Sequence, residues 1–316
     1  MTVSQPRILV AGCGAMGGIV AAALSSHAAV TVYDIDTAHI RAIRDGGLRV
    51  TGLSERVARL SAVYDAAALA VQAFEAVVFL VKSKDTAPAA ASLHGVLHGR
   101  PLLVTLQNGM GNDDVLLGIP DLPVARGAMM EAGRYLAPGH VEHLMRSQTW
   151  LGPRRGSVED VRWFAGLLTG CGMKTELMAD PMGAVWSKFI FNSVMNPVGA
   201  LLLGVNAARY EVAEVRALID EMAAECLAVA KALDAPLAFD PMEPVRRIRV
   251  GSLPMSRHGG SMALDIARGA PTEIDELTGY ILREADRLGI SVPTCKTVYR
   301  LVKGLERAAA IKGGNS

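Results

Sequence analysis

A lysine and two asparagines share one side of an otherwise apolar segment. Lys188, Asn192 and Asn196 are spaced four residues apart, and at about 100° per residue they fall within about 80° on a helix. Such a polar stripe either faces water or meets polar partners in a cleft, where a lysine can give a proton to a reacting group. The pattern alone leaves open that Lys188 reaches solvent while the two amides cap or bridge neighbouring helices.

Pro197 follows this stripe directly. A proline has no N–H group, so the carbonyl of Ser193 loses its helical hydrogen bond and the helix is kinked or loosened there. We therefore expect another group to donate a hydrogen bond to that carbonyl.

A glycine-rich run lies near the start of the chain. Residues Gly12–Gly17 read GCGAMG, after the apolar run ILVA and before an alanine-rich helical pattern. In this context Gly12 makes a tight turn, Gly14 lets the backbone approach a pyrophosphate, and Gly17 lets the helix pack closely on the strand. The helix start offers N–H groups and a positive dipole end to phosphates. The run predicts a dinucleotide site, with a tight structural turn as the alternative; its expected contacts are Gly12, Gly14, Ala15, Met16 and Gly17.

Asp34 ends the next strand-like run, VTVYD, 22 residues after Gly12. An acidic side chain at this place accepts hydrogen bonds from the ribose hydroxyls of adenosine and repels a 2′-phosphate. No arginine, which would favour NADP, lies within residues 30–40. The position therefore favours NAD over NADP, and a surface carboxylate at a strand end is the alternative.

Two more polar runs follow apolar strand-like runs. Residues 81–86 read VKSKDT and residues 107–111 read QNGMG. Ligands of open α/β sheets bind outside the carboxyl ends of the strands, so we expect both loops to face the cofactor. Lys82 and Asn108 are expected to point into the site, with the Asn108 amide on the ribose or carboxamide of the nicotinamide half. Lys84 is expected to lie in solvent.

The last polar constellation lies near the C-terminus. Ser261 precedes the run PTEID, Pro271–Asp275. We expect Glu273 in the first turn of a helix over residues 273–288, where a carboxylate complements the helix dipole. Asp275 could fill the same role, so the cap alone does not require both acids.

Composition excludes several classes of function. The 316 residues carry 32 Lys+Arg against 31 Asp+Glu, a net charge of +1, which gives no electrostatic attraction to phosphate backbones or anionic lipid. The 6 Phe, 6 Tyr and 3 Trp are too few for base-stacking platforms. We expect no nucleic-acid or membrane partner. Hydrophobic residues make up 51%, enough for a large core, and the length suggests about two domains.

The remaining signals concern metals, location and the membrane. The four cysteines form no CxxC pair and no histidine stands at metal-ligand spacing, so we expect neither a metal site nor a disulfide framework. The N-terminal run MTVSQPRILVAG lacks the regions of a signal peptide, and we expect a cytoplasmic protein. The segment Phe189–Ala208 is very apolar but holds Asn192, Asn196 and Asn206. Three amides are costly in lipid, which favours a buried helix of a soluble protein.

These side chains need elements that position them. In the first half, apolar runs buried on both faces alternate with helical patterns, which predicts an α/β fold with a doubly wound parallel sheet. The expected strands are 7–11, 30–33, 76–81 and 102–106, and the expected helices are 15–26, 38–45 and 87–97.

After a last strand at 174–177, the dipeptide Asp180-Pro181 marks a change to helical periodicity. The expected helices are 184–203, 211–233, 241–250, 273–288 and 298–309. We place a domain boundary here, between a Rossmann-type dinucleotide-binding domain, residues 1–180, and an all-helical substrate-binding and catalytic domain, residues 181–316.

Taken together, the motifs carry a family resemblance. The runs GCGAMG, VKSKDT, QNGMG, WSKFIFNSVMNPVGAL and SMALDIARGAPTEIDELTG resemble those of the ketopantoate reductase (2-dehydropantoate 2-reductase) family, from about Arg7 to about Lys303. The last two are the most specific. The resemblance implies an N-terminal Rossmann domain, a C-terminal helical domain and a site in the cleft between them.

The resemblance also implies a role for each matching residue. Lys188 corresponds to the family's catalytic lysine, a general acid toward the substrate carbonyl oxygen, and Glu273 to the glutamate that contacts substrate and lysine. Asn192 and Asn196 correspond to substrate-binding amides, and Ser261 to the serine that meets the substrate carboxylate. Lys82 and Asn108 match residues where cofactor and substrate meet. Hydride transfer from a nicotinamide to a 2-keto acid with a lysine as proton donor requires no metal.

Asp34 departs from the family pattern, because members that make pantoate generally use NADPH and carry a basic residue there. NAD-linked paralogues act as D-2-hydroxy acid dehydrogenases on branched or aromatic acids such as mandelate, which is the alternative function. In the loop before Ser261, Arg257 could pair with a carboxylate and His258 could line the pocket, but a mobile polar loop is the favoured interpretation. A non-catalytic dinucleotide sensor is disfavoured, because the catalytic set is complete. The apolar helices of the second domain are compatible with a homodimer, which the sequence alone does not establish.

Overall fold

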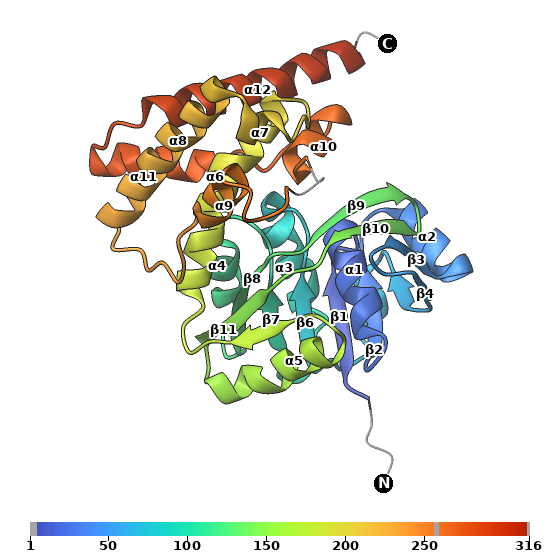
Figure 1. The fold of residues 1–316 in the computed structure, drawn as a ribbon. Helices are drawn as coiled ribbons and strands as arrows, with labels where there is room; N and C mark the ends of the chain where they lie inside the picture. The colour runs from blue at the N-terminus through green and yellow to red at the C-terminus, as the bar shows by residue number, and fades with distance from the viewer. Residues whose placement is uncertain (1–4, 256–258, 315–316) are drawn as a thin grey trace. The chain divides into compact units, whose positions relative to one another are not determined.

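The computed structural model describes residues 5–255 and 259–314 and divides into two compact units (Figure 1). Unit 1 consists of Met1–Gln107 and Gly111–Pro181, and unit 2 of Asn108–Met110 and Met182–Ser316. The short segment Asn108–Met110 therefore groups with the helices, although its neighbours on both sides belong to unit 1. Arg257 and His258, considered above as pocket residues, lie outside the described residues.

Unit 1 is built on an eight-stranded sheet of order β12-β11-β8-β7-β6-β1-β2-β5. Its strands are β1 Arg7–Ala11, β2 Ala29–Tyr33, β5 Ser61–Val63, β6 Ala76–Phe79, β7 Leu102–Thr105, β8 Val124–Met129, β11 Thr149–Arg155 and β12 Thr175–Leu177. The expected doubly wound parallel sheet is confirmed for the six strands from β5 to β8. The two strands at the other edge run the opposite way, since β11 pairs with β8 antiparallel and with β12 parallel.

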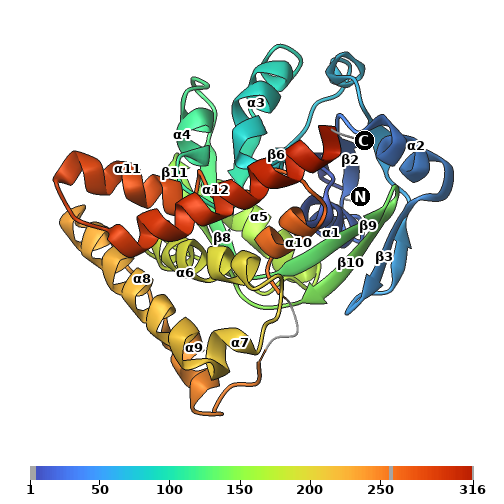
Figure 2. The same ribbon diagram turned by 90° about the horizontal axis from the view of Figure 1, so that it is seen from above.

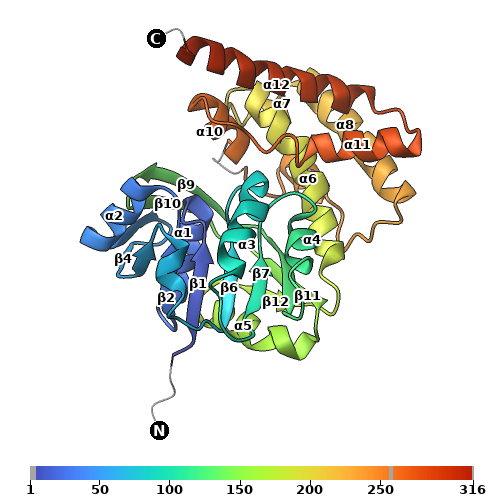
Figure 3. The ribbon, with the colours of Figure 1, turned by 180° about the vertical axis from the view of Figure 1, so that it is seen from behind.

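Helices cover both faces of this sheet, and α2 (Thr37–Gly46) follows β2. α1 (Ala15–Leu24) and α5 (Val158–Gly170) lie on one face, and α3 (Thr86–His94) and α4 (Asn112–Leu117) on the other (Figures 1 and 3). The strands serve both layers, because successive side chains of a strand point to opposite faces. In β1, Ile8 and Val10 belong to one hydrophobic cluster and Leu9 to another, all three without exposed surface.

A second, four-stranded sheet of order β4-β3-β10-β9 was not predicted from the sequence. Its strands are β3 Leu48–Gly52, β4 Arg56–Ala58, β9 Ala132–Ala137 and β10 His140–Met145. The sheet packs on α1 through close approaches, since a Cβ atom added at Gly18 would lie 3.2 Å from the side chain of Val141. It brings the turn at Gly139, between β9 and β10, to α2, because a Cβ atom added there would lie 3.0 Å from Ala42.

Unit 2 consists of helices joined by loops, with no strand among its described residues. Its helices are α6 Met182–Leu201, α7 Ala208–Glu211, α8 Ala213–Ala232, α9 Glu243–Arg249, α10 Ser261–Ala267, α11 Thr278–Leu288 and α12 Pro293–Gly314. The central α6 packs against α8, α10 and α12 (Figure 2). In the parts of the chain that the structure describes, no helix has both the length and the apolar character that a membrane crossing demands.

One expected helix start is wrong. Glu273 does not lie in the first turn of a helix, because α11 begins only at Thr278, after a turn over residues 274–277. The local sequence resembles a cap, but the hydroxyl group of Thr272 donates to Glu306 of α12 instead, at 2.6 Å. A contact with a residue 34 positions away thus replaces the local cap.

The expected partner of the Ser193 carbonyl is present. The hydroxyl group of Thr278 donates a hydrogen bond of 2.8 Å to it, in place of the N–H group that Pro197 lacks. Thr278 has no exposed surface, so the bond lies in the interior of unit 2. It joins the first residue of α11 to the interrupted turn of α6.

Replacing Thr278 by valine keeps the side-chain shape but leaves this carbonyl unpaired. We expect the free energy of unfolding to fall by about 1–3 kcal/mol, the cost of a buried group without a partner. Urea denaturation followed by circular dichroism measures the loss. Thr297→Val is the control, because the Thr297 hydroxyl bonds the Pro293 carbonyl at 2.9 Å on the exposed side of α12. Equal losses in the two variants would contradict this account of α6.

Candidate active site

The glycine run forms a tight, close-packed loop. Gly12 has φ +89°, and a Cβ atom there would lie 2.6 Å from the backbone nitrogen of Val81. A Cβ atom at Gly17 would lie 1.8 Å from the carbonyl oxygen of Gly12, which only glycine allows. At Gly14 an added Cβ atom would have no described atom within 4 Å, so the space over its backbone is open.

Helix α1 begins directly after this loop, next to the open space over Gly14. Within the described residues, no side chain caps the helix, whose N-cap is Gly14. The first N–H groups of a helix have no partner inside it. Ala15, Met16 and Gly17, the first three residues of α1, therefore offer a ready site for phosphate oxygens.

Cys13, between the first two glycines, is held from both sides. Its N–H group donates to Oδ2 of Asp34 at 2.7 Å, and its carbonyl lies 2.8 Å from Nε2 of His39. The Gly139 N–H group donates to Nδ1 of His39 at 2.9 Å, so Nε2 carries the proton and donates to Cys13. Burial, and secondarily the charge of Asp34, raises the pKa of the Cys13 thiol, which stays protonated. Sequence reasoning missed His39, because its partner Gly139 is 100 residues away.

Asp34 thus has a structural contact in addition to the expected ligand contact. Its other oxygen, Oδ1, accepts the N–H group of Asp36 at 2.9 Å. A carboxylate has about four acceptor positions, so these two bonds leave capacity for ribose hydroxyls. The carboxylate of Asp36 caps α2, accepting from the N–H groups of Ala38 and His39. Two carboxylates therefore follow β2.

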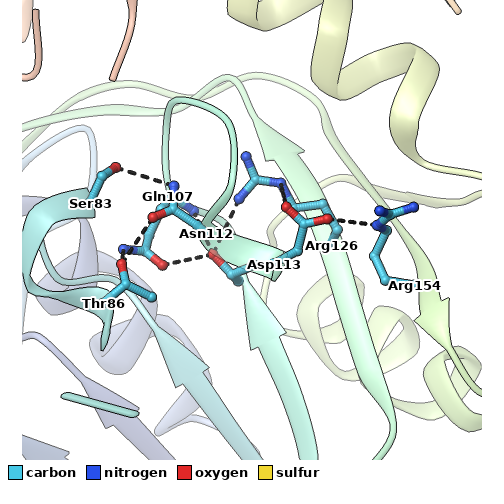
Figure 4. Close-up of polar contacts among 8 residues, drawn as sticks. Ser83, Thr86, Gln107, Asn112, Asp113, Arg126 and Arg154 are labelled. Carbon is cyan, nitrogen blue, oxygen red and sulfur yellow. Dashed lines mark hydrogen bonds and ion pairs between the residues drawn. The ribbon is translucent and has the colours of Figure 1, made fainter. Parts of the chain in front are cut away.

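The loops after β6 and β7 are tied together by buried side chains (Figure 4). Nε2 of Gln107 donates to the carbonyl of Val81 at 2.8 Å and to the hydroxyl group of Thr86 at 2.7 Å. That hydroxyl group donates to Oδ1 of Asn112 at 2.9 Å, and Nδ2 of Asn112 donates to Ser83 at 3.2 Å. The two loops therefore hold one geometry, which sequence reasoning did not foresee.

Lys82 and Asn108 each stand one residue beyond this network. Lys82 is exposed and precedes the short 3-10 helix η2 (Ser83–Asp85), whereas Asn108 is half-buried. Lys84 is exposed, as expected. The network fixes the backbone from which Lys82 and Asn108 project.

The network continues to a buried ion pair. Asp113 accepts Nε of Arg154 at 2.6 Å, and its other oxygen lies 3.8 Å from Nε of Arg126 (Figure 4). Nη1 of Arg126 donates to the hydroxyl group of Thr105 at 3.3 Å. Burial lowers the pKa of Arg126, and the charge of Asp113 opposes that effect. A buried cation needs such partners, so Asp113 and Arg126 belong together.

In unit 2, the polar stripe of α6 meets the segment from Asn108 to Met110. Nδ2 of Asn192 donates to Oδ1 of Asn108 at 3.4 Å. Asn192 is buried, with 8% of its surface exposed, and Lys188 and Asn196 are half-buried. The amide of Asn192 therefore bridges α6 to the Asn108–Met110 segment.

The start of α10 lies beside the other end of the stripe. Gly260 precedes Ser261, the first residue of α10, and a Cβ atom added at Gly260 would lie 3.8 Å from Oδ1 of Asn196. Nη2 of the buried Arg209 donates to the Gly259 carbonyl at 2.6 Å and holds this approach. Asn196 and the half-buried Ser261 are therefore brought to neighbouring positions.

Glu273 lies half-buried on the bend before α11. The following turn contacts Gly109, where an added Cβ atom would lie 3.1 Å from the Glu276 carbonyl oxygen. The Asn108–Met110 segment therefore contacts α6 through Asn108 and the turn after Glu273 through Gly109, while Lys188 and Glu273 stand on separate elements. Unit 2 thus carries the expected amides, hydroxyl group, amine and carboxylate, groups that could bind a small polar anion. The described residues include no group of three or more His, Cys, Asp or Glu that could hold a metal ion.

Two alanine substitutions in the glycine run test its geometry. Gly17→Ala forces a methyl group onto the Gly12 carbonyl, so we expect a loss of at least about 3 kcal/mol in the free energy of unfolding. Gly14→Ala meets open space at an ordinary φ of −61° and should change it by no more than about 0.5 kcal/mol. Urea denaturation compares the two. A stable Gly17→Ala variant would show that the close approach is not a constraint.

Comparison with known proteins places the chain in a family. The family model described as "Ketopantoate reductase PanE/ApbA" matches residues 8–156, and "Ketopantoate reductase PanE/ApbA C terminal" matches residues 180–306. The 2-dehydropantoate 2-reductase of Halobacterium salinarum is 31% identical over 306 residues, covering 95% of this chain and 99% of the relative. The corresponding enzyme of Pyrococcus horikoshii is 28% identical, covering 95% and 97%.

Solved structures also match this chain. The PanE/ApbA family ketopantoate reductase of Ralstonia eutropha has 31% identity and a TM-score of 0.84, covering 96% of this chain and 99% of that one. The ternary structure of D-mandelate dehydrogenase with NADH and anilino(oxo)acetate has a TM-score of 0.87 with the same coverage, but at 22% identity it shows the fold alone. The chain belongs to the ketopantoate reductase family and is an oxidoreductase of that family.

Proposed function

We propose that this protein reduces a branched 2-keto acid, 2-dehydropantoate, to its 2-hydroxy acid with a reduced nicotinamide cofactor. The observation that carries the proposal is the hydrogen bond between Asn192 and Asn108. Asn192 lies one turn of α6 after Lys188. Two relatives that match nearly the whole chain, at 31% and 28% identity, are named for this reaction. Unit 1 would hold the cofactor, and unit 2 would hold the keto acid.

The residues of unit 1 fit a dinucleotide. The space over Gly14 is open, the start of α1 has no side-chain cap among the described residues, and Asp34 keeps acceptor capacity. The N–H groups of α1 would bind the pyrophosphate, and Asp34 would accept the ribose hydroxyls. When bound, the reduced nicotinamide supplies a hydride.

The residues of unit 2 would bind the anionic substrate and protonate its keto oxygen. As the keto carbon is reduced, its oxygen gains negative charge, and Nζ of Lys188 would donate the proton that makes it a hydroxyl group. Asn192 and Asn196 would hold the substrate's polar groups, and Ser261 would bind its carboxylate. Glu273 would contact both the substrate and Lys188. With a net charge of +1 the whole chain gives little steering, so these local groups must bind the anion.

We further propose that the cofactor is NADH rather than NADPH. Asp34 and Asp36 both follow β2, and two carboxylates there repel a 2′-phosphate. The same feature favours a second candidate, an NAD-linked D-2-hydroxy acid dehydrogenase. Two D-mandelate dehydrogenase structures that share the fold contain NADH.

The decisive assay follows absorbance at 340 nm with 2-dehydropantoate and either reduced cofactor, and then with a panel of other 2-keto acids. Highest kcat/KM for 2-dehydropantoate supports the proposal. Highest kcat/KM for an aromatic keto acid such as benzoylformate supports the second candidate. No oxidation of either cofactor with any keto acid would refute both.

Replacing Lys188 by alanine removes the proposed proton donor. We expect kcat to fall by about 10²-fold or more, the usual contribution of a general acid, while the dissociation constant of the cofactor stays similar. Steady-state kinetics and cofactor fluorescence titration measure the two quantities. Lys231→Ala, which removes an exposed lysine from α8, should leave both unchanged. An unaltered kcat in Lys188→Ala would exclude this lysine from the mechanism.

Replacing Asp34 by alanine removes the proposed barrier to a 2′-phosphate. We expect the ratio of kcat/KM for NADPH to that for NADH to rise about tenfold or more, since charged hydrogen bonds to the ribose are lost. Asp34→Asn, which keeps an acceptor for the Cys13 N–H group, separates charge from loop geometry. Gly14→Ala is the control and should weaken both cofactors alike. An unchanged ratio in both Asp34 variants would mean that this side chain does not contact the ribose.

A homodimer and a cytoplasmic location also remain predictions. The ketopantoate reductase of Staphylococcus aureus, whose structure shares this fold at 20% identity, is described as dimeric.

A further inference from the structure

The loop that carries Glu273 is fastened to α12 on both sides of this residue. On the N-terminal side, Thr272 donates two hydrogen bonds to Oε1 of Glu306, from its N–H group at 2.7 Å and from its hydroxyl group at 2.6 Å. The Thr272 hydroxyl also accepts the N–H group of Ile274 at 3.2 Å. The residue directly before Glu273 is therefore fixed to α12.

On the C-terminal side, Asp275 makes the second attachment. The Tyr299 hydroxyl donates to Oδ1 of Asp275 at 2.6 Å, and Nζ of Lys303 donates to Oδ2 at 3.0 Å. Nη1 of Arg283 donates to the backbone carbonyl of Asp275 at 3.0 Å. Asp275, expected from the sequence as a possible helix cap, binds α12 instead.

Lys303 connects the two attachments. Its ammonium group lies 3.0 Å from Oδ2 of Asp275 and 2.7 Å from Oε2 of Glu306. Tyr299, Lys303 and Glu306 recur at the spacing that puts side chains on one face of a helix. Burial alone would raise the pKa values of Asp275 and Glu306, but the hydrogen bonds of the cluster outweigh it and hold both below their ordinary values. Both acids are therefore carboxylates near neutral pH.

The cluster leaves Glu273 between two fixed neighbours. Ile274, the next residue, has no exposed surface and belongs to the hydrophobic core of unit 2. The backbone on both sides of Glu273 is thus set by packing and by hydrogen bonds to α12, and its half-buried carboxylate projects from a defined position. Catalytic groups need such support to keep their geometry.

We propose that Tyr299, Lys303 and Glu306 are positioning residues that hold Glu273 for the reaction through Thr272 and Asp275. The proposal rests on the proposed role of Glu273. The Lys303–Asp275 pair is suited to positioning rather than to stability, because it is partly exposed: 26% of the Lys303 side chain and 47% of the Asp275 side chain face solvent, against 12% of the Glu306 side chain. A partly exposed pair adds little to the folding free energy, so breaking the Lys303–Asp275 pair should free the loop without unfolding the chain.

A double-mutant cycle between Lys303→Met and Glu273→Gln tests the inference. We expect Lys303→Met to lower kcat about tenfold, with the KM for the cofactor and the melting temperature little changed. In the Glu273→Gln background the same substitution should lower kcat by less than twofold, because the group it positions is already lost. A purely structural role would give the same factor in both backgrounds, and that result would overturn the inference.

A second pair of variants tests the other attachment. Thr272→Val removes the hydroxyl donor to Glu306 and should lower kcat several-fold, whereas Thr272→Ser keeps the donor and should restore most of the activity. Arg287→Met is the matched control, because it breaks a partly exposed pair with Glu284 within α11, 2.7 Å apart, in which no residue of the Glu273 loop or of the cluster takes part. If Arg287→Met lowers kcat as much as Lys303→Met, the effect is not specific and the inference is wrong.

The variants distinguish a failure of the proposed role of Glu273 from a failure of the positioning inference. If Glu273→Gln alone leaves kcat and KM unchanged, the role of Glu273 in the proposed function is refuted, and the positioning inference falls with it. If Glu273→Gln lowers kcat but Lys303→Met does not, only the positioning inference is refuted.

Discussion

The close approach of Gly17 to the carbonyl of Gly12 sets the geometry on which unit 1 depends. A missing Cβ atom lets α1 begin directly against the turn that ends β1, and the positive φ of Gly12 provides that turn. Cys13, between the glycines, then reaches both Asp34 after β2 and His39 on α2. One steric constraint thus aligns a helix start, a carboxylate and a buried histidine around the place where a pyrophosphate would bind.

The polar loops of both units follow a common rule: buried or half-buried side chains from distant parts of the chain fix their backbone. Gln107 and Asn112 tie the loops after β6 and β7, and Thr278 donates to the carbonyl that Pro197 leaves unpaired. Glu306 does the same for the loop of Glu273. Buried polar groups need partners, and here those partners also hold the residues that we assign to chemistry.

The sequence predicted the features that depend on local physics. The continuous apolar run of β1, the glycine run and the effect of Pro197 all follow from neighbouring residues, and their elements lie where expected. The predicted start of α11 was wrong, because Thr272 binds Glu306 rather than capping a helix. The sheet of β3 and β10 joins residues about 90 positions apart through short, partly polar strands, which carry little local signal. His39, Arg126 and the α12 cluster were missed for the same reason, because their partners are remote.

The central claim is that a hydride passes from a nicotinamide cofactor to C2 of a 2-keto acid, and isotope transfer tests it most directly. The protein is incubated with 2-dehydropantoate and a reduced cofactor carrying deuterium at C4 on one face, in separate reactions for the two faces. The account predicts that one of the two reactions gives pantoate with deuterium at C2, one deuteron for each cofactor oxidised. Cofactor oxidation without deuterium at C2 in either reaction would contradict it.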